Sequence, residues 1–235
     1  MTGTAYYAAT RGEGMVKAPW PALLAGVLLV VSGCAAGGAP APAASPADLI
    51  NVLHRSMLDD TDLKGVGLDP AKDTGLVKDG QINADPERPC RTKIKSDVDR
   101  RKAVQTGYDS PDIQVLHRAF SYRSVSGADV VAQIKKVVTG CDTYQIKTER
   151  GNTTYTVNPT VPLPELDGLD AAYAYCEQGV AGQWLWWVCH LQLASGRVVS
   201  TLRVNGATEE RTQQVLAELA PAAAHLLIKA TGSGS

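Results

Sequence analysis

The sequence contains little of what several common functions need. Only 6% of the 235 residues are aromatic, with a single phenylalanine, and the formal net charge is −1. Without an excess of Lys and Arg there is no basic face for a nucleic acid, so we expect no nucleic-acid partner. His-Glu-x-x-His, Gly-x-Ser-x-Gly, Cys-x-x-Cys and a glycine-rich phosphate loop are all absent. The sequence therefore predicts no enzyme, no metal and no cofactor.

The N-terminal segment is typical of an exported lipoprotein. An uncharged apolar run at 18–31 follows Lys17 and is too short to span a bilayer comfortably. It leads into the residues "VSGC", which end at Cys34 and resemble the bacterial lipobox. The resemblance implies a signal peptide at 1–33 and a diacylglyceryl-Cys34 that attaches the protein to the extracytoplasmic face of the cell membrane. Met15 is the alternative true start, because it begins a better-proportioned signal peptide.

The residues after Cys34 predict a short tether and one domain. The stretch at 35–45, "AAGGAPAPAAS", contains only Ala, Gly, Pro and Ser and indicates a linker. We therefore assign 34–45 to the lipidated cysteine and tether, 46–231 to a single domain and 232–235 to a disordered tail. The domain is long enough for a core of its own, and we expect a monomer.

The five cysteines fit this assignment. Cys34 is taken by lipid, which leaves Cys90, Cys141, Cys176 and Cys189 in an oxidising compartment, where three pairings are open. Cys176 and Cys189 lie on two neighbouring strand-like runs joined by "QGVAG", which favours Cys176–Cys189 and leaves Cys90–Cys141. Zinc is the competing interpretation, but no two of these cysteines have C-x₂-C spacing.

Hydrophobic periodicity predicts a helix from 46, a strand at 113–122 and a second helix that Ser126 caps and Gly140 ends. Residues 59–107 have little periodicity and indicate only loops and short strands.

Five further strand-like runs follow, and then a helix at 208–229 that Pro221 should kink or split. This order predicts an α+β fold, with a mostly antiparallel sheet of about five to six strands and helices packed on one side.

The layout resembles the extracellular sensor domain of the mycobacterial PknH-type serine/threonine kinases and related stand-alone actinobacterial lipoproteins. The points of resemblance are a helix after a Pro/Ala tether, a first cysteine in a loop-rich segment, a strand that ends in Phe120-Ser121, "GADVVAQIKKVV" before Cys141, and two further cysteines close together. The family pairs its cysteines first-to-second and third-to-fourth. The resemblance implies extracytoplasmic sensing and no catalytic residues, and it does not extend to the tryptophan cluster described next.

Three of the four tryptophans fall in "GQWLWWVCHLQL", at 182–193. With the period of a strand, Trp187 shares a face with Cys189 and the leucines, whereas Trp184 and Trp186 share the other face with His190. The two indoles either pack under the proline-rich connection at 159–164 and cover the sheet, or line a cleft or docking patch. For the second interpretation the candidate binding residues are Trp184, Trp186 and His190, with Arg118 as a companion from the strand at 113–122.

These observations predict a lipid-anchored, non-catalytic domain that binds a ligand or a partner protein of the bacterial cell envelope. The alternative is a carrier of lipid or glycolipid, which would need a large apolar cavity.

Overall fold

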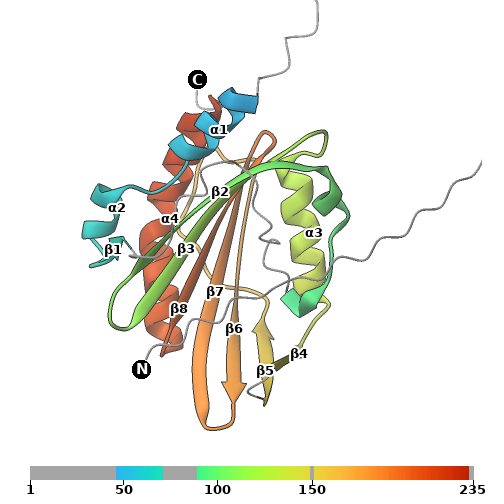
Figure 1. The fold of residues 1–235 in the computed structure, drawn as a ribbon, viewed down its shortest axis with the longest axis vertical. Helices are drawn as coiled ribbons and strands as arrows, with labels where there is room; N and C mark the ends of the chain where they lie inside the picture. The colour runs from blue at the N-terminus through green and yellow to red at the C-terminus, as the bar shows by residue number, and fades with distance from the viewer. Residues whose placement is uncertain (1–45, 71–88, 149–150, 233–235) are drawn as a thin grey trace, which may run out of the picture. The chain divides into compact units, whose positions relative to one another are not determined.

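An antiparallel sheet of eight strands organises the fold, in the order β1-β2-β3-β8-β7-β6-β5-β4 (Figure 1). The structure is a computed structural model that describes residues 46–70, 89–148 and 151–232. The predicted signal peptide, Cys34, the tether and almost all of the predicted tail lie outside these residues. The strands are β1 (Asp69–Pro70), β2 (Arg100–Asp109), β3 (Ile113–Tyr122), β4 (Thr143–Thr148), β5 (Gly151–Asn158), β6 (Ala171–Ala181), β7 (Trp184–Ser195) and β8 (Val198–Gly206).

Three helices have ten residues or more: α1 (Pro46–Arg55), α3 (Gly127–Thr139) and α4 (Glu209–Thr231). A five-residue helix, α2 (Asp60–Lys64), and two 3-10 turns, η1 (Pro89–Arg91) and η2 (Lys95–Asp99), complete the described elements. The α+β class is confirmed. In the described part of the chain, no helix is long and apolar enough to cross a membrane.

The sheet carries helices on both faces, and the prediction that they pack on one side is wrong. Cys189, Leu191 and Leu193 of β7 belong to a core with α1, α2 and α4, and we call this side of the sheet the α4 face. The alternate residues of the same strand point the other way, and Ala194 belongs to a second core with α3, on the α3 face. The reason for the error lies in β7, whose last eight residues are all buried, so that both faces of the strand need cover.

The two cores differ in character. The α4 face is aliphatic, with Leu202 and Val204 of β8 packed against Val215, Leu216 and Leu219 of α4. The α3 face is more aromatic. Its buried members include Phe120, Tyr122, Tyr173 and Tyr175 from the sheet and Val130, Val131, Ile134 and Val138 from the helix.

The start of α3 is fixed by three local features. Ser126 Oγ accepts the backbone N–H of Asp129 at 3.1 Å, as the sequence predicted. The Asp99 carboxylate accepts the backbone N–H groups of Ser124 and Val125 at 2.7 and 2.9 Å, and these donors lower its pKa to about 2. Gly127 lies so near the sheet that a β-carbon there would come within 2.8 Å of the Val198 carbonyl oxygen. The helix can therefore dock closely only because this residue is glycine.

Two further expectations need correction. Pro221 does not split the C-terminal helix, because α4 is continuous from Glu209 to Thr231. The proline is exposed, so the ring and the missing N–H face solvent rather than the core. Residues 71–88 of the segment at 59–107 lie outside the described residues, but the end of the segment is not a loop or a short strand, because β2 is a ten-residue strand paired along β3. With β1 and β2 the sheet has eight strands instead of five to six.

Both predicted disulfides, Cys176–Cys189 and Cys90–Cys141, are formed. Cys176 faces Cys189 directly across the β6–β7 pair and is fully buried on the α4 face. The Cys90–Cys141 bond joins η1 to the residue that follows Gly140 at the end of α3.

The helices differ in how much of the sheet they can cover. At 1.5 Å per residue α4 is about 35 Å long and α3 about 20 Å, whereas the twelve residues of β7 extend about 40 Å. The shorter helix therefore covers only part of the α3 face, and the rest of that face carries the aromatic part of the candidate site.

We expect the buried His117 to make the fold sensitive to acid. Its Nδ1 accepts the Leu58 N–H at 3.1 Å, so the proton is on Nε2, which lies 2.8 Å from Ser200 Oγ. Burial lowers the pKa of His117 from 6.5 to about 3. Between these values the unfolded chain binds a proton that the folded chain does not. The free energy of unfolding should therefore fall on acidification from about pH 6.5, by up to about 1.4 kcal/mol per pH unit from this residue.

Urea unfolding of the wild type and of His117→Gln, measured between pH 7 and pH 4.5, checks this expectation. The substituted protein should be less stable at pH 7 and should lose less stability on acidification. Equal slopes in the two proteins would contradict the assignment to His117.

Candidate functional site

The tryptophans of β7 divide between the two faces as the alternation predicted. Trp184 lies opposite Ala181 and Trp186 opposite Gly179, both on the α3 face. Trp187 lies opposite Gln178 of β6 and Gly206 of β8, on the α4 face. Trp184 is 71% exposed and Trp186 is half-buried, because α3 does not reach this end of the hairpin. Val161 of the proline-rich connection packs in the core of the α4 face, on the other side of the sheet from the indoles.

Trp186 takes its place from Gly179 across the strand pair. A β-carbon at Gly179 would overlap the indole, so the ring lies directly over the glycine backbone. The Tyr155 ring of β5 meets the indole edge-on, with centroids 6.0 Å apart and planes at 85°. Tyr144 of β4 stacks on Tyr155 at 4.9 Å. We call Tyr144, Tyr155 and Trp186 the aromatic wall.

A buried polar pair supports this wall from below. The Tyr144 hydroxyl donates to Glu177 Oε1 at 3.1 Å, and Glu177 Oε2 lies 3.3 Å from His190 Nε2. Burial and then the negative charge of Glu177 raise the pKa of Tyr144, so the phenol stays protonated and keeps donating. His190 stacks on Tyr175 at 4.5 Å and is only 3% exposed. The residue holds the wall in place and does not present an imidazole to a ligand.

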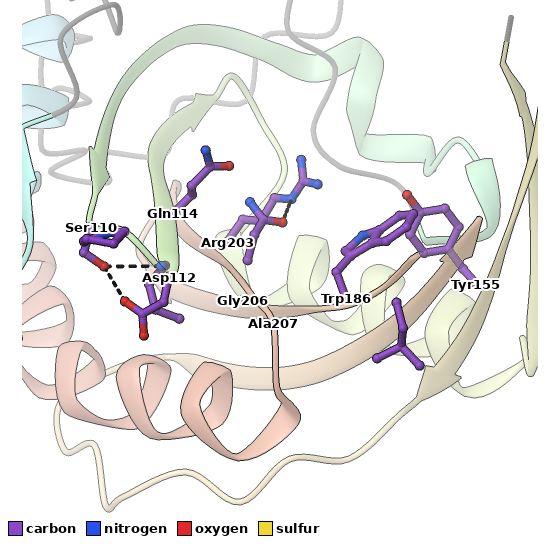
Figure 2. A pocket seen from close by; sticks show the side chains of 12 residues that line it. Ser110, Asp112, Gln114, Tyr155, Trp186, Arg203, Gly206 and Ala207 are labelled. Atoms are coloured by element: carbon purple, nitrogen blue, oxygen red, sulfur yellow. Dashed lines mark hydrogen bonds between the residues drawn. The ribbon is translucent and has the colours of Figure 1, made fainter. Parts of the chain in front are cut away.

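A cleft of about 670 Å³ opens beside the aromatic wall. Tyr155 and Trp186 lie at one end, and Arg203 and Gln114 lie in the middle (Figure 2). Leu185 and Asn205 also line the cleft. The other end is the β2–β3 turn, where the Ser110 hydroxyl donates to Asp112 Oδ1 at 2.9 Å and accepts the Ile113 N–H at 3.2 Å. Arg203 Nε donates to Asn205 Oδ1 at 3.1 Å, which orients both planar groups. The cleft thus has apolar ring surface and several hydrogen-bonding groups in a volume typical of ligand sites.

The predicted site residues are not all in this cleft. Trp186 lines it, and Trp184 lies two residues further along the same face towards the tip of the hairpin. His190 lies beneath the wall. Arg118 of β3 lies opposite Thr201 of β8, which in turn lies opposite Gln192 of β7, six residues along the strand from Trp186. Its Nε donates to Gln105 at 3.2 Å, and it does not line the cleft.

The sequence did not indicate four other residues that line the cleft. These are Tyr155 of β5, Gln114 of β3, and Arg203 and Asn205 of β8. Alternation along 198–206 places Arg203 and Asn205 on one face, but only the strand pairing shows that His190 is their neighbour: Arg203 lies directly opposite it.

Two kinds of site were sought among the described residues, a metal site and an accessible His–Ser pair. No group of three or more His, Cys, Asp or Glu side chains within 46–70, 89–148 and 151–232 could hold a metal ion. His117 and Ser200 form a hydrogen-bonded pair, but both are fully buried, and His117 Nδ1 is occupied by a backbone N–H. A substrate could not reach this serine, and we assign the pair to stability.

Comparisons with known proteins show a likeness of fold. No protein-family model matches the chain, and no curated protein sequence does. Among solved structures, the extracellular domain of PknH from Mycobacterium tuberculosis is similar, with 10% identity over 73% of this chain and 94% of that chain and a TM-score of 0.47. An uncharacterised protein from Mycobacterium smegmatis is 11% identical over 53% of this chain and 63% of that chain, with a TM-score of 0.33. The PknH extracellular domain, which the sequence layout resembles, is thus also among the structural matches. At these identities and TM-scores the matches assign no ligand.

Gly179→Ala should displace the indole of Trp186, because the new methyl group would occupy the space of the ring. We expect tryptophan fluorescence to shift towards that of exposed indole and the free energy of unfolding to fall by about 1–3 kcal/mol. Gly65→Ala is the matched control, since a β-carbon there meets nothing within 4 Å and the backbone φ is −62°. If both variants had the same fluorescence and stability, the close contact between Gly179 and Trp186 would be refuted.

Proposed function

We propose that the protein is a lipid-anchored, extracytoplasmic binding domain of the bacterial cell envelope, without catalytic activity, whose ligand occupies the cleft beside the aromatic wall. The observation that carries this proposal is the combination of the half-buried Trp186 and Tyr155 with Arg203, Asn205 and Gln114 around about 670 Å³. Aromatic surface left partly uncovered next to oriented polar groups is costly in water unless it binds something.

The cleft and α1, the first described helix, lie near opposite ends of α4 (Figure 1). Arg55 of α1 lines a surface hollow together with Leu226 and Lys229, at the C-terminal end of α4. The cleft includes Gly206 and Ala207, just before the N-terminus of α4. The two ends of α4 are about 35 Å apart. Within the domain, the cleft and α1 therefore lie near opposite ends of α4.

The polar lining also bears on the choice between a sensor and a lipid carrier. An acyl chain gains most from an enclosed apolar cavity, because there all of its surface leaves water. The cleft instead is open and is lined by an arginine, an asparagine and a glutamine. A polar ligand matches this surface better than an acyl chain does.

Native mass spectrometry of the full chain, purified from the membranes of an actinobacterial host, tests the proposal. We expect a noncovalent adduct of constant mass on the wild type, and a smaller bound fraction on Trp186→Ala. The conservative Trp187→Phe, which changes the opposite face of the same strand, is the control and should retain the adduct. The protein mass should include a diacylglyceryl group that Cys34→Ser lacks.

Loss of the adduct in Trp187→Phe but not in Trp186→Ala would place binding elsewhere and contradict the proposed site. An adduct with the mass of a phospholipid or glycolipid that Trp186→Ala retains would favour the carrier function.

A further inference from the structure

We propose that the cleft binds a saccharide, with the indoles of β7 as stacking platforms for successive sugar units; this inference rests on the proposed binding function and names its ligand class. A sugar ring has an apolar face of C–H groups and an edge of hydroxyl groups. A site for it therefore needs flat aromatic surface and, at right angles to it, planar groups that donate and accept in pairs.

The cleft supplies both kinds of surface. Trp186 offers the ring, and its position is fixed from below by Gly179 and from the side by Tyr155. Arg203, Asn205 and Gln114 are planar side chains with several donors and, in the two amides, acceptors. Because Arg203 Nε is bonded to Asn205, the plane of the guanidinium is set before a ligand arrives, which reduces the ordering cost of binding.

The charge of the cleft favours a neutral or singly charged ligand. Among the lining residues Arg203 is the one cation and Asp112 the one anion. The Asp112 carboxylate accepts from Ser110 and lies 3.9 Å from Arg211, so part of its charge is compensated. A phosphate-rich ligand needs several cations, usually arginines in paired contacts, and a cationic ligand needs more than one acidic group. An oligosaccharide that is uncharged, or carries one carboxylate, needs neither.

Trp184 makes the site longer than the cleft itself. It lies on the same face as Trp186 and two residues away, which places the two side chains about 7 Å apart along the strand. The residue opposite it is Ala181, whose small side chain leaves the indole 71% exposed. Two platforms in line along β7 fit consecutive units of an extended chain. The side chains in the cleft would hold the first unit, and Trp184 would contact a later one.

An array of defined oligosaccharides tests this inference on the full chain, kept in a detergent without a sugar headgroup. The array should present neutral hexose and pentose oligomers, N-acetylated amino-sugar oligomers, and oligomers with one carboxylate per unit, each as dimer and tetramer. We expect one of these classes to be retained, and its Kd to be measurable by titration calorimetry.

The variants make the test specific. Trp186→Ala should weaken binding of dimer and tetramer alike, by about tenfold, because a stacking ring is lost. Trp184→Ala should weaken the tetramer but leave the dimer unchanged, and this residue is too exposed for its removal to unfold the protein. Trp187→Phe should bind both oligomers as the wild type does.

The inference is overturned if no oligosaccharide is retained, or if binding is the same in Trp184→Ala and Trp186→Ala as in the wild type. The proposed function has a separate outcome. If the native adduct depends on Trp186 but is a peptide, a protein or a lipid, the cleft remains a binding site and only the saccharide is refuted. If neither oligosaccharides nor the adduct depend on Trp186, both proposals fail.

Discussion

The register of the β6–β7 hairpin is the constraint on which the rest of the structure depends. Cys176 faces Cys189, and the disulfide between them excludes any other alignment of these two strands. A slip of one residue would transfer every side chain of one strand to the opposite face. The same alignment places Gly179 under Trp186 and Glu177 within reach of His190. The covalent bond on the α4 face thus determines the geometry of the site on the α3 face.

The cleft follows from a mismatch in length. On one face α4, a helix of 23 residues, covers the central strands. On the other face α3, a helix of 13 residues, covers only the end of these strands that lies away from the β6–β7 turn. Side chains on the uncovered part have no helix to pack against, so they need contacts and hydrogen bonds with one another. The tyrosines and Trp186 do so by packing on each other, and Glu177 by bonding to Tyr144. The result is a preformed surface on rigid strands, which suits binding because little order is lost when a ligand arrives.

Much of this fold could be predicted from local patterns. The strand at 113–122, the helix capped by Ser126 and both disulfides agree with the structure because each depends on neighbouring residues or on compartment chemistry. The strand β2 was missed because "RRKAVQTGYD" shows no clear alternation. Helices on both faces were missed because the face with His190 and Gln192 reads as polar, although both residues are buried. The sequence alone does not show that these polar side chains lie in a core.

The site was predictable only in part, for a related reason. Alternation on β7 identified Trp184 and Trp186 and the face to which they belong. Arg203, Gln114 and Tyr155 come from three other strands and meet Trp186 only through pairings between residues far apart in the chain. Arg118 differs from Arg203 in its position along the sheet, since the strand pairings align it with Gln192 rather than with the tryptophans, and the sequence does not show this alignment.

The most direct test of the binding surface is an NMR titration of the indole N–H signals of the full chain with soluble material extracted from the cell envelope. The signals are assigned by substituting one tryptophan at a time. The account predicts that the signals of Trp184 and Trp186 shift together and saturate, whereas that of Trp187, on the opposite face of the same strand, stays in place. A shift at Trp187 with no change at Trp186 would show that the α3 face is not the binding surface.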